Sequence, residues 1–392
     1  MKKIKKFLIL ISIILALYFW SLAFLRLNPS IEIVTKMKCL PEFDYEKKEG
    51  INILSFKTCE PYEAWKFHWE KMKKEIKEMI SYLKNEMLLW WKDKYLAYPV
   101  YSILQYKAKK FLKYIPQENL EEMQGIADGA GVNFNDILLI NTYDDMLQIA
   151  GCSSMVIPKK EWFNDNFIHT RNLDYPIKIL AKNKVVLKYK SHISVWFPGY
   201  IWVLTWIWYQ WISLSSHTAY SVNKANFWIP SGLLYRKVLM SKNIEEAKNI
   251  LKNAKRTIAN NLMIWSYKEN LWIVAEFDSK NIDFREIKNE KIIVSTNHFR
   301  SQKMKKISRN SKWARYGQYF EKIWQIEKID LEKIKNILSY YKKSRYWSTI
   351  ANNWTVQSVI MIPKLNKIFV ANGEEIPVTK GKYIEIDFKF ND

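Results

Sequence analysis

Cys152 carries the side chain best suited to covalent chemistry in this sequence. It lies in Gly151-Cys152-Ser153-Ser154-Met155-Val156-Ile157, where a glycine precedes the cysteine and a β-rich run follows it. Glycine lets another backbone approach closely, and a cysteine thiol next to a base is a strong nucleophile. The pattern indicates a nucleophile at the start of a strand, whereas a cysteine without such a context is more often a small buried hydrophobe.

A polar cluster lies shortly downstream, in His169-Thr170-Arg171-Asn172-Leu173-Asp174-Tyr175. This cluster lies at the end of a second predicted strand and just beyond it. Arg171 and Asp174 together are suited to holding a charged nucleophile in register, and the alternative is an ion pair that serves only the structure.

These residues resemble a known family. The pair Cys-Ser-Ser and Arg-Asn-Leu-Asp is similar to the signature of the choloylglycine hydrolase and acid ceramidase group of N-terminal-nucleophile hydrolases, with its acyltransferase branch that includes isopenicillin N acyltransferase. Other segments agree in the same order, over roughly Glu118 to Phe388. They are Gly125 to Gly131 with Asn141, Ser295 to Phe299, Ser311 to Tyr316 and Thr355 to Val359.

The resemblance implies an αββα sandwich and a precursor that cuts itself between Gly151 and Cys152. The cut would divide a helical N-terminal portion, residues 29–151, from a catalytic portion, residues 152–392. A terminal cysteine carries its own base, because the freed α-amino group titrates near about pH 8 and can accept the thiol proton. No cofactor or metal is implied, since no His, Asp and Glu cluster has the spacing of metal ligands.

The resemblance also implies a role for each site residue. Arg171 would lie beside the sulfur of Cys152, and Asp174 would bind its α-amino group. Asn297 would donate to the oxyanion of the tetrahedral intermediate, and Arg315 would organise the same pocket. The alternatives are a turn cap for Asn297 and a solvated charge for Arg315.

One position departs from the family pattern. After Ile212-Ser213-Leu214-Ser215-Ser216, relatives commonly carry an asparagine in the oxyanion hole, and this chain has His217. A histidine can also donate a hydrogen bond, so His217 is a candidate. Asn223 or Asn226 is the alternative donor.

The elements that must position these residues change in character at Cys152. Helical spacing dominates before it, at residues 72–87, 117–130 and 135–147. Strand-like runs follow at 153–157, 167–171, 185–189, 201–205, 212–216, 262–267, 273–277, 292–295, 356–362, 367–371 and 383–388, with helices at 231–240, 244–254 and 311–341. We therefore predict an α/β (α+β) fold in which helices cover two sheets.

The N-terminus has a basic stretch before an uncharged, mostly apolar run from Phe7 to Leu25. This is typical of a signal peptide or a membrane anchor over residues 1–28, and no small-x-small cleavage site follows. We predict an uncleaved anchor in the membrane with the catalytic body outside the cytoplasm, or a secreted protein. The alternative is a buried core helix.

The charge and the cysteines indicate which binding partners and which disulfide to expect. The formal net charge is +23, from 62 Lys plus Arg against 39 Asp plus Glu. The lysines are scattered and no nucleic-acid recognition motif accompanies them, so a solvated surface is predicted rather than nucleic-acid binding. Cys39 and Cys59 could pair in an oxidising compartment.

Tryptophan is unusually abundant and glycine unusually scarce. The chain has 18 Trp and 10 Gly, where an average composition predicts roughly 27 Gly. Trp202, Trp206, Trp211, Trp228 and Trp354 stand where relatives tend to have glycine. We hypothesise that such positions are encoded by UGA codons that the source organism reads as glycine. UGG codons at these positions would exclude this hypothesis. The alternative is an aromatic surface for lipid or glycan.

The resulting prediction is a self-processed cysteine amidase that hydrolyses the C–N bond of a linear N-acyl amide through a thioester on Cys152. The amide could be lipid-like, and the two fragments are expected to stay associated. One rival is an acyltransferase that passes the acyl group to an amine. Another is a noncatalytic, membrane-anchored binding protein with the same fold.

Overall fold

Two β-sheets form the centre of the protein. The computed structural model describes residues 2–26, 31, 33, 42–57, 61–87, 94–158, 167–189, 192–202, 205–208, 212–286, 292–309, 314–343 and 348–388. The larger sheet has nine strands in the order β1-β2-β5-β6-β7-β8-β9-β10-β11. Its strands are β1 (Phe43–Lys48), β2 (Ile51–Phe56), β5 (Val185–Lys188), β6 (His192–Trp196), β7 (Thr205–Trp208), β8 (Ile212–Thr218), β9 (Asn260–Ser266), β10 (Leu271–Phe277) and β11 (Ile282–Glu286).

The second sheet has six strands in the order β12-β3-β4-β13-β14-β15, and every neighbouring pair is antiparallel. Its strands are β12 (Ile293–Ser295), β3 (Gly151–Ile157), β4 (Ile168–Asp174), β13 (Thr355–Ile362), β14 (Lys367–Asn372) and β15 (Lys382–Asp387). β3 and β4, which carry Cys152, Arg171 and Asp174, are therefore the second and third strands from one edge.

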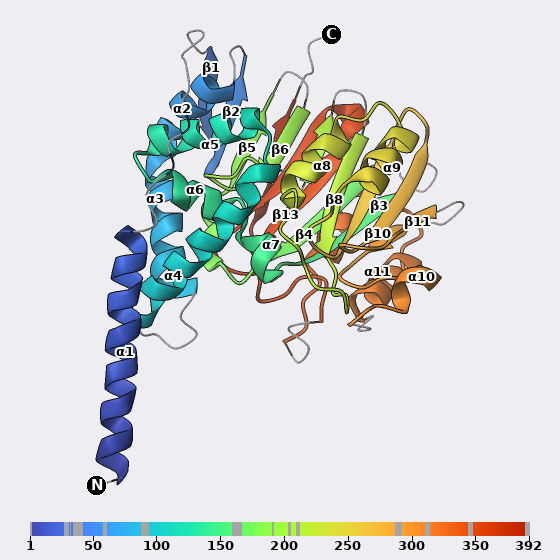
Figure 1. Cartoon of the computed structure of the whole chain (residues 1–392). Helices are drawn as coiled ribbons and strands as arrows, with labels where there is room; N and C mark the ends of the chain where they lie inside the picture. The colour runs from blue at the N-terminus through green and yellow to red at the C-terminus, as the bar shows by residue number, and fades with distance from the viewer. Residues whose placement is uncertain are drawn as a thin grey trace.

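The two sheets face each other and helices cover them on both outer sides (Figure 1). β3 packs against β8 between the sheets. Helices α8 (Ser231–Leu239) and α9 (Ile244–Asn253) lie on the nine-stranded sheet, and α11 (Ala314–Trp324) lies on β3 and β12, next to α12 (Leu331–Leu338). Strands covered on both faces bury all their side chains, which β4, β8 and β13 do. The α+β class and the four layers agree with the prediction.

The N-terminal portion is less purely helical than the sequence indicates. Its helices are α2 (Pro61–Lys71), α3 (Lys73–Tyr82), η1 (Leu83–Met87), α4 (Lys94–Ala108), η2 (Lys109–Tyr114), α5 (Gln117–Ala130), α6 (Phe134–Ile140) and α7 (Tyr143–Leu147). The hairpin of β1 and β2 was not predicted, and β2 pairs in parallel with β5. The segment before Cys152 is thus part of the same sheet as the segment after it.

Two glycines of α5 allow α2 to pack tightly on it. A Cβ at Gly129 would lie 2.1 Å from the carbonyl oxygen of Lys66, and one at Gly125 would lie 2.5 Å from that of Tyr62. Such a distance is far below van der Waals contact, so a larger residue at either position would push the helices apart.

Some other predictions of elements were wrong in detail. Residues 201 and 202 are not in a strand, and β7 begins at Thr205. The helix predicted over 311–341 is two helices, α11 and α12. Strands β6 and β11 were missed, as were helix α10 (Gln302–Lys305) and the short turns η4 (Lys178–Ala181), η6 (Pro363–Leu365) and η7 (Val378–Lys380). Short strands give too few alternations for a periodic signal.

The N-terminal residues form α1 (Lys2–Arg26), which extends away from the body in Figure 1. Its apolar side chains face outward, with Leu8 58% and Phe19 65% exposed, which excludes a buried core helix for the part of α1 whose side chains are described. Of the helices in the described ranges, none combines the length and the hydropathy needed to cross a membrane. The anchor predicted for residues 7–25 gains no support from this, and the location of the body stays a prediction.

The structure describes three of the tryptophans proposed to be recoded glycines. Trp202 is buried, and its ring covers Gly232 so closely that a Cβ there would lie 2.3 Å from the Trp202 Cγ. None of the residues Trp202, Trp228 and Trp354 has a positive φ, so the backbone φ at these three positions does not require glycine. Trp211 and the side chain of Trp206 lie outside the described part, and the recoding hypothesis stays untested.

Candidate active site

The Cys152 side chain lies between the two sheets, at the second residue of β3. It is only 1% exposed. Burial raises the pKa of the thiol, because it penalises the charged thiolate, whereas the nearby guanidinium of Arg171 lowers it. Besides burial, the Arg171 cation has the largest effect on how readily the thiol loses its proton, and the charges of Asp174 and Arg315 add smaller and opposite effects.

Arg171 provides that cation from the neighbouring strand. Ser154 of β3 lies opposite Arg171 of β4 in the register, so the side chains of Cys152, Ser154 and Arg171 share one face of the sheet. The Arg171 Nη2 donates to the Cys152 Sγ at 3.2 Å and to the carbonyl oxygen of Ser216 at 3.1 Å. The predicted place of Arg171 beside the sulfur agrees with this geometry.

Asn297 holds the backbone nitrogen of Cys152. The Cys152 N–H donates to the Asn297 Oδ1 at 2.9 Å, and the Asn297 Nδ2 donates to the carbonyl oxygen of Thr218 at 2.7 Å. The Asn297 Oδ1 also accepts from Arg315 Nη2. Both groups that contact Oδ1 are donors, which fixes the orientation of the amide. One donor bond of the Asn297 amide is thus made to Thr218 in this uncut chain, and its role as oxyanion donor stays a prediction.

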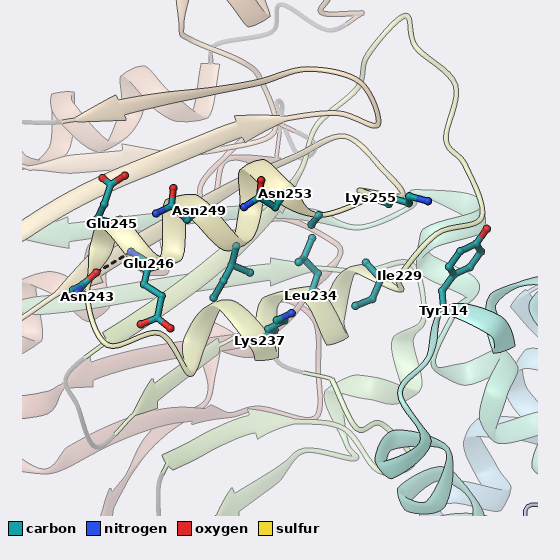
Figure 2. A pocket seen from close by; sticks show the side chains of 12 residues that line it. Tyr114, Ile229, Leu234, Lys237, Asn243, Glu245, Glu246, Asn249, Asn253 and Lys255 are labelled. Atoms are coloured by element: carbon teal, nitrogen blue, oxygen red, sulfur yellow. Dashed lines mark hydrogen bonds between the residues drawn. The ribbon is translucent and has the colours of Figure 1, made fainter.

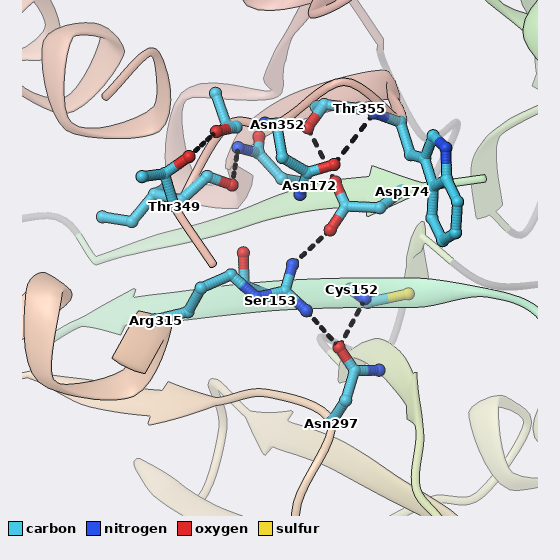
Figure 3. A network of polar contacts seen from close by, with 12 residues as sticks. Cys152, Ser153, Asn172, Asp174, Asn297, Arg315, Thr349, Asn352 and Thr355 are labelled. Atoms are coloured by element: carbon cyan, nitrogen blue, oxygen red, sulfur yellow. Dashed lines mark hydrogen bonds and ion pairs between the residues drawn. The ribbon is translucent and has the colours of Figure 1, made fainter. Parts of the chain in front are cut away.

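Asp174 and Arg315 complete the cluster (Figure 3). Arg315, in the first turn of α11, donates to Asp174 Oδ2 through Nη1 and to Asn297 Oδ1 through Nη2. The α-amino group that Asp174 is predicted to bind exists only after the cut, so this role stays a prediction. In the uncut chain Asp174 lies beside Gly151, where an added Cβ would be 3.4 Å from Asp174 Oδ2. A solvated surface role for Arg315 is thereby excluded.

The sequence analysis missed several residues that support this cluster. Thr355 at the start of β13 donates to Asp174 Oδ1 at 2.7 Å. Asn261 of β9 donates to the carbonyl oxygens of Thr296 and His298, both at 2.8 Å, and so shapes the turn that carries Asn297. Thr355 belongs to a segment that the family resemblance covers, whereas Asn261 gives no local signal.

His217 lies between the sheets without contacting the sulfur. Its Nε2 is 2.7 Å from Ser154 Oγ, and its Nδ1 is 3.0 Å from the carbonyl oxygen of Asn261. The carbonyl only accepts, so Nδ1 carries the proton and Nε2 accepts from the serine. The role of oxyanion donor predicted for His217 therefore does not fit, because both ring nitrogens are already engaged.

We expect His217→Gln to flatten the acid side of the stability profile. Burial holds the pKa of His217 well below its usual value, so the folded protein takes up no proton there when the pH falls below about 6.5, where an unfolded histidine does. The buried, neutral His217 therefore lowers the unfolding free energy by about 1.4 kcal/mol for each pH unit below that point. Urea melts from pH 7 to 5 should show a shallower slope in the variant, and parallel profiles would contradict it.

The other two oxyanion candidates lie elsewhere. Asn223 donates to Asp278 Oδ2 at 2.9 Å, and Asn226 is exposed in the same loop, where its N–H donates to the carbonyl oxygen of Thr257. The structure does not bring either side chain into the Cys152 cluster. Cys39 and Cys59 lie outside the described residues, so their pairing stays a prediction, and among the described residues no cluster of His, Cys, Asp and Glu could hold a metal.

A groove of about 710 Å³ lies away from this cluster, along α8 and α9 (Figure 2). Its lining includes Leu234, Lys237 and Asn249, and extends to Tyr114 and Lys255 at one end. None of the residues that line it is a cysteine, serine or threonine, so it offers no side chain for acyl transfer of the kind that Cys152 supports.

Comparisons with known proteins find a family and two curated relatives. The family described as acyl-coenzyme A:6-aminopenicillanic acid acyl-transferase matches residues 214–353. The protein dcd1A of Dictyostelium discoideum is 27% identical over 184 residues, 42% of this chain and 41% of that protein. The N-acylethanolamine-hydrolyzing acid amidase of Caenorhabditis elegans is 30% identical over 115 residues, 28% of this chain and 31% of that protein. The chain thus spans less than half the length of either relative.

Two solved structures are similar at lower identity. The Caenorhabditis elegans N-acylethanolamine-hydrolyzing acid amidase ortholog gives a TM-score of 0.43 at 20% identity, covering 55% of this chain and 94% of that one. A mutant conjugated bile acid hydrolase from Clostridium perfringens gives 0.37 at 11% identity, covering 61% and 97%. The family match contains Asn297 and Arg315, whereas Cys152, Arg171 and Asp174 lie before it.

Proposed function

We propose that the chain is a relative of the N-terminal-nucleophile hydrolases and that Cys152 is its nucleophile. Residues 214–353 match the family described as acyl-coenzyme A:6-aminopenicillanic acid acyl-transferase, and 115 residues are 30% identical to an N-acylethanolamine-hydrolyzing acid amidase. The proposed activity is hydrolysis of the C–N bond of a linear N-acyl amide after self-cleavage. The observation that carries it is the 3.2 Å contact of Arg171 Nη2 with Cys152 Sγ, beside a backbone nitrogen that Asn297 holds at 2.9 Å.

Self-cleavage comes first in this proposal. The Cys152 sulfur attacks the carbonyl carbon of Gly151, the peptide C–N bond breaks, and the nitrogen takes up a proton to become the free α-amino group. Water then hydrolyses the resulting thioester, which leaves a carboxylate on Gly151 and a free thiol on Cys152. Arg171 supports this step because its positive charge stabilises the thiolate.

The mature reaction repeats the same chemistry on a substrate. The α-amino group accepts the thiol proton, and the thiolate attacks the acyl carbon of the amide. The leaving amine departs with that proton, and water releases the acid from the thioester. Self-cleavage turns the Cys152 amide, whose single N–H donates to Asn297, into an amine that can donate to more than one acceptor. Asp174 lies close enough to Gly151 to become the second acceptor.

The two fragments should stay together after the cut. β2 precedes Cys152 and pairs in parallel with β5, which follows it, and the buried faces of α5 and α6 join the main hydrophobic core. Separating the fragments would expose this core to water, at about 25 cal/mol for each Å² of apolar surface. We propose that the mature protein is a tightly associated pair of fragments.

N-acyl amides are the substrates to test first. The name of the Caenorhabditis elegans relative gives N-acylethanolamines as one class, and these are lipid-like. Purified protein should run on a denaturing gel as fragments 1–151 and 152–392. After incubation with N-acylethanolamines of different chain length, mass spectrometry should find the acyl group on Cys152. A chain that stays intact and binds without turnover would replace this proposal by the noncatalytic binding protein.

Acyl transfer to an amine is a second candidate, which the description of the matching family favours. It uses the same thioester and differs only in whether an amine or water takes the acyl group. Adding 6-aminopenicillanic acid to the assay and analysing the products separates the two, because a transferase makes a new amide at the expense of free acid.

A further inference from the structure

Asn297 lies in a turn, residues 296–301, that joins β12 to α10. The turn places the Asn297 amide, whose Oδ1 accepts from the backbone N–H of Cys152, the nitrogen that self-cleavage would free. The backbone groups of a buried turn need hydrogen-bond partners other than those of a helix or a strand. In this protein two buried side chains of the nine-stranded sheet provide such partners.

Asn261 of β9 holds the residues on either side of Asn297. Its Nδ2 donates to the carbonyl oxygens of Thr296 and His298, both at 2.8 Å. Asn261 is only 1% exposed, so little water can compete for these two hydrogen bonds. The chain is therefore held by its carbonyl groups directly before and directly after the residue that contacts Cys152.

Glu276 of β10 holds the end of the same turn. Its Oε2 accepts from the backbone N–H groups of Arg300 at 2.7 Å and of Ser301 at 2.8 Å. Its Oε1 accepts from Arg285 Nε at 2.6 Å. Glu276 is 0% exposed, and charged carboxylates are seldom buried unless other groups compensate them. Here one guanidinium and two backbone N–H groups of the turn compensate the carboxylate.

The two side chains reach the turn from one place on the sheet. Glu276 and Asn261 are directly opposite each other in the antiparallel pairing of β10 with β9, so they point to the same face with their Cβ atoms about 4.5–5.5 Å apart. Asn261 donates to carbonyl oxygens of the turn, and Glu276 accepts from its N–H groups. The four hydrogen bonds thus hold both ends of residues 296–301.

We propose that Glu276 is a positioning residue for self-cleavage, which with Asn261 holds Asn297 against the bond that is cut. This inference rests on the proposed function. Attack on a carbonyl needs the reacting atoms about 3–3.5 Å apart and aligned, and a displacement of about 1 Å can cost on the order of 100-fold in rate. A turn that loses its buried acceptor shifts Asn297, and with it the nitrogen side of the peptide bond between Gly151 and Cys152.

The first test compares Glu276→Leu with Glu276→Gln in the full chain made by cell-free translation, where loss of the uncut band gives the rate of self-cleavage. Leucine has no acceptor for the two N–H groups of the turn, so we expect cleavage about 10- to 30-fold slower than in the wild type. Glutamine keeps one oxygen that can accept from both N–H groups and should stay within about threefold. A wild-type rate in Glu276→Leu overturns the inference, as does equal slowing in both variants.

Glu122→Leu is the matched control, because it also removes a buried glutamate from a pair with an arginine. Glu122 of α5 is 2% exposed, and its oxygens accept from Arg236 Nη1 at 2.5 Å and Nη2 at 2.8 Å. These contacts join α5 to α8 and do not involve residues 296–301. Self-cleavage in Glu122→Leu should stay within about threefold of the wild type. Slowing equal to that of Glu276→Leu would mean that the rate follows a general loss of stability, which contradicts positioning.

A double-mutant cycle with Asn297→Ala shows whether Glu276 acts through Asn297. If it does, adding Glu276→Leu to Asn297→Ala should slow self-cleavage by no more than about twofold, because the side chain that the turn positions is already absent. A further slowing of about 10- to 30-fold in the double variant would show two independent effects and would refute the inference.

Glu276→Asp keeps the test decisive if Glu276→Leu does not fold. Aspartate keeps the charge next to Arg285 and draws the oxygens back from the turn by one methylene group. Self-cleavage about three- to tenfold slower than in the wild type supports the inference, since longer hydrogen bonds loosen the turn only in part. An unchanged rate contradicts it.

Hydrogen exchange measures the hold on the turn without any cleavage. In Cys152→Ala, which should stay uncut, peptides that span residues 296–301 should exchange at least about tenfold faster when Glu276→Leu is added, because two N–H groups lose their acceptor. Adding Glu122→Leu should leave this exchange unchanged. Unchanged exchange with Glu276→Leu rejects the inference even where cleavage is slow. Faster exchange in a protein whose wild type never cuts itself would instead reject the proposed function and support the hold on the turn.

Discussion

Cys152→Ala should abolish self-cleavage and reduce amide hydrolysis by at least about 10⁴-fold. The sulfur is the only group in the Cys152 cluster that can form the acyl intermediate, and removal of a catalytic nucleophile commonly has an effect of this size. The other members of the cluster cannot replace it, because Arg171 and Arg315 carry no lone pair for attack and Asn297 and Asp174 are engaged in hydrogen bonds. The variant should run as a single uncut chain on a denaturing gel.

The fold of this variant should be retained. Alanine removes one buried atom, which changes the unfolding free energy by about 1 kcal/mol, and the backbone N–H of Cys152 can still donate to Asn297. Thermal melting by circular dichroism checks this. Cys152→Ser is the matched variant, since it keeps a hydroxyl of nearly the same size that ionises far less readily than a thiol. Cleavage after Gly151 in folded Cys152→Ala would refute the assignment of the nucleophile.

Arg171→Gln is expected to slow self-cleavage by about 10- to 100-fold and to make the thiol harder to ionise. Burial raises the pKa of Cys152 and the Arg171 guanidinium lowers it, so without the guanidinium the pKa rises further. Less thiolate is then present near neutral pH. A hydrogen bond to a charged group contributes about 1.5–3 kcal/mol, which corresponds to the stated loss of rate.

Alkylation by iodoacetamide measures the ionisation directly. The rate of alkylation at Cys152, followed by mass spectrometry of its peptide so that Cys39 and Cys59 do not contribute, should move to higher pH in Arg171→Gln. Arg171→Lys retains the charge and loses the planar guanidinium, whose Nη2 donates to both the sulfur and the Ser216 carbonyl. It should recover part of the lost rate. Identical pH profiles for wild type and Arg171→Gln would show that Arg171 does not tune the thiol.

Much of the candidate site could be predicted because its members sit in short, recognisable segments. Cys152 lies near the start of a strand as predicted, whereas Arg171, predicted at the end of a strand, lies in the middle of β4. The side chains that share one face of a strand follow from its period of two. Arg315 gave only a weak signal on a basic helix. Only the packing of α11 against β3 showed that it reaches Asp174 and Asn297.

The hydrogen-bond partners could not be predicted. The sequence indicated oxyanion donors at Asn297 and His217, and the structure engages both in other contacts, with the Thr218 carbonyl and with Ser154 and the Asn261 carbonyl. Ser154 comes from the sheet that faces His217 and Asn261 from the strand next to it, and both are far away in the chain. Which donor meets which acceptor depends on how the two sheets are placed, and no local pattern encodes that.

By itself, the sequence indicated Cys152 as the candidate nucleophile, Arg171 as its cationic partner on the next strand, and an α+β fold with two covered sheets. It could do so because residue chemistry, strand period and collinear motifs are properties of short segments. Only the tertiary structure decided that β2 joins the sheet of β5, that Asn297 holds the Cys152 nitrogen, and that Arg315 reaches both Asp174 and Asn297. These contacts join segments that are brought together by the packing of buried surfaces, whose geometry is a property of the whole chain.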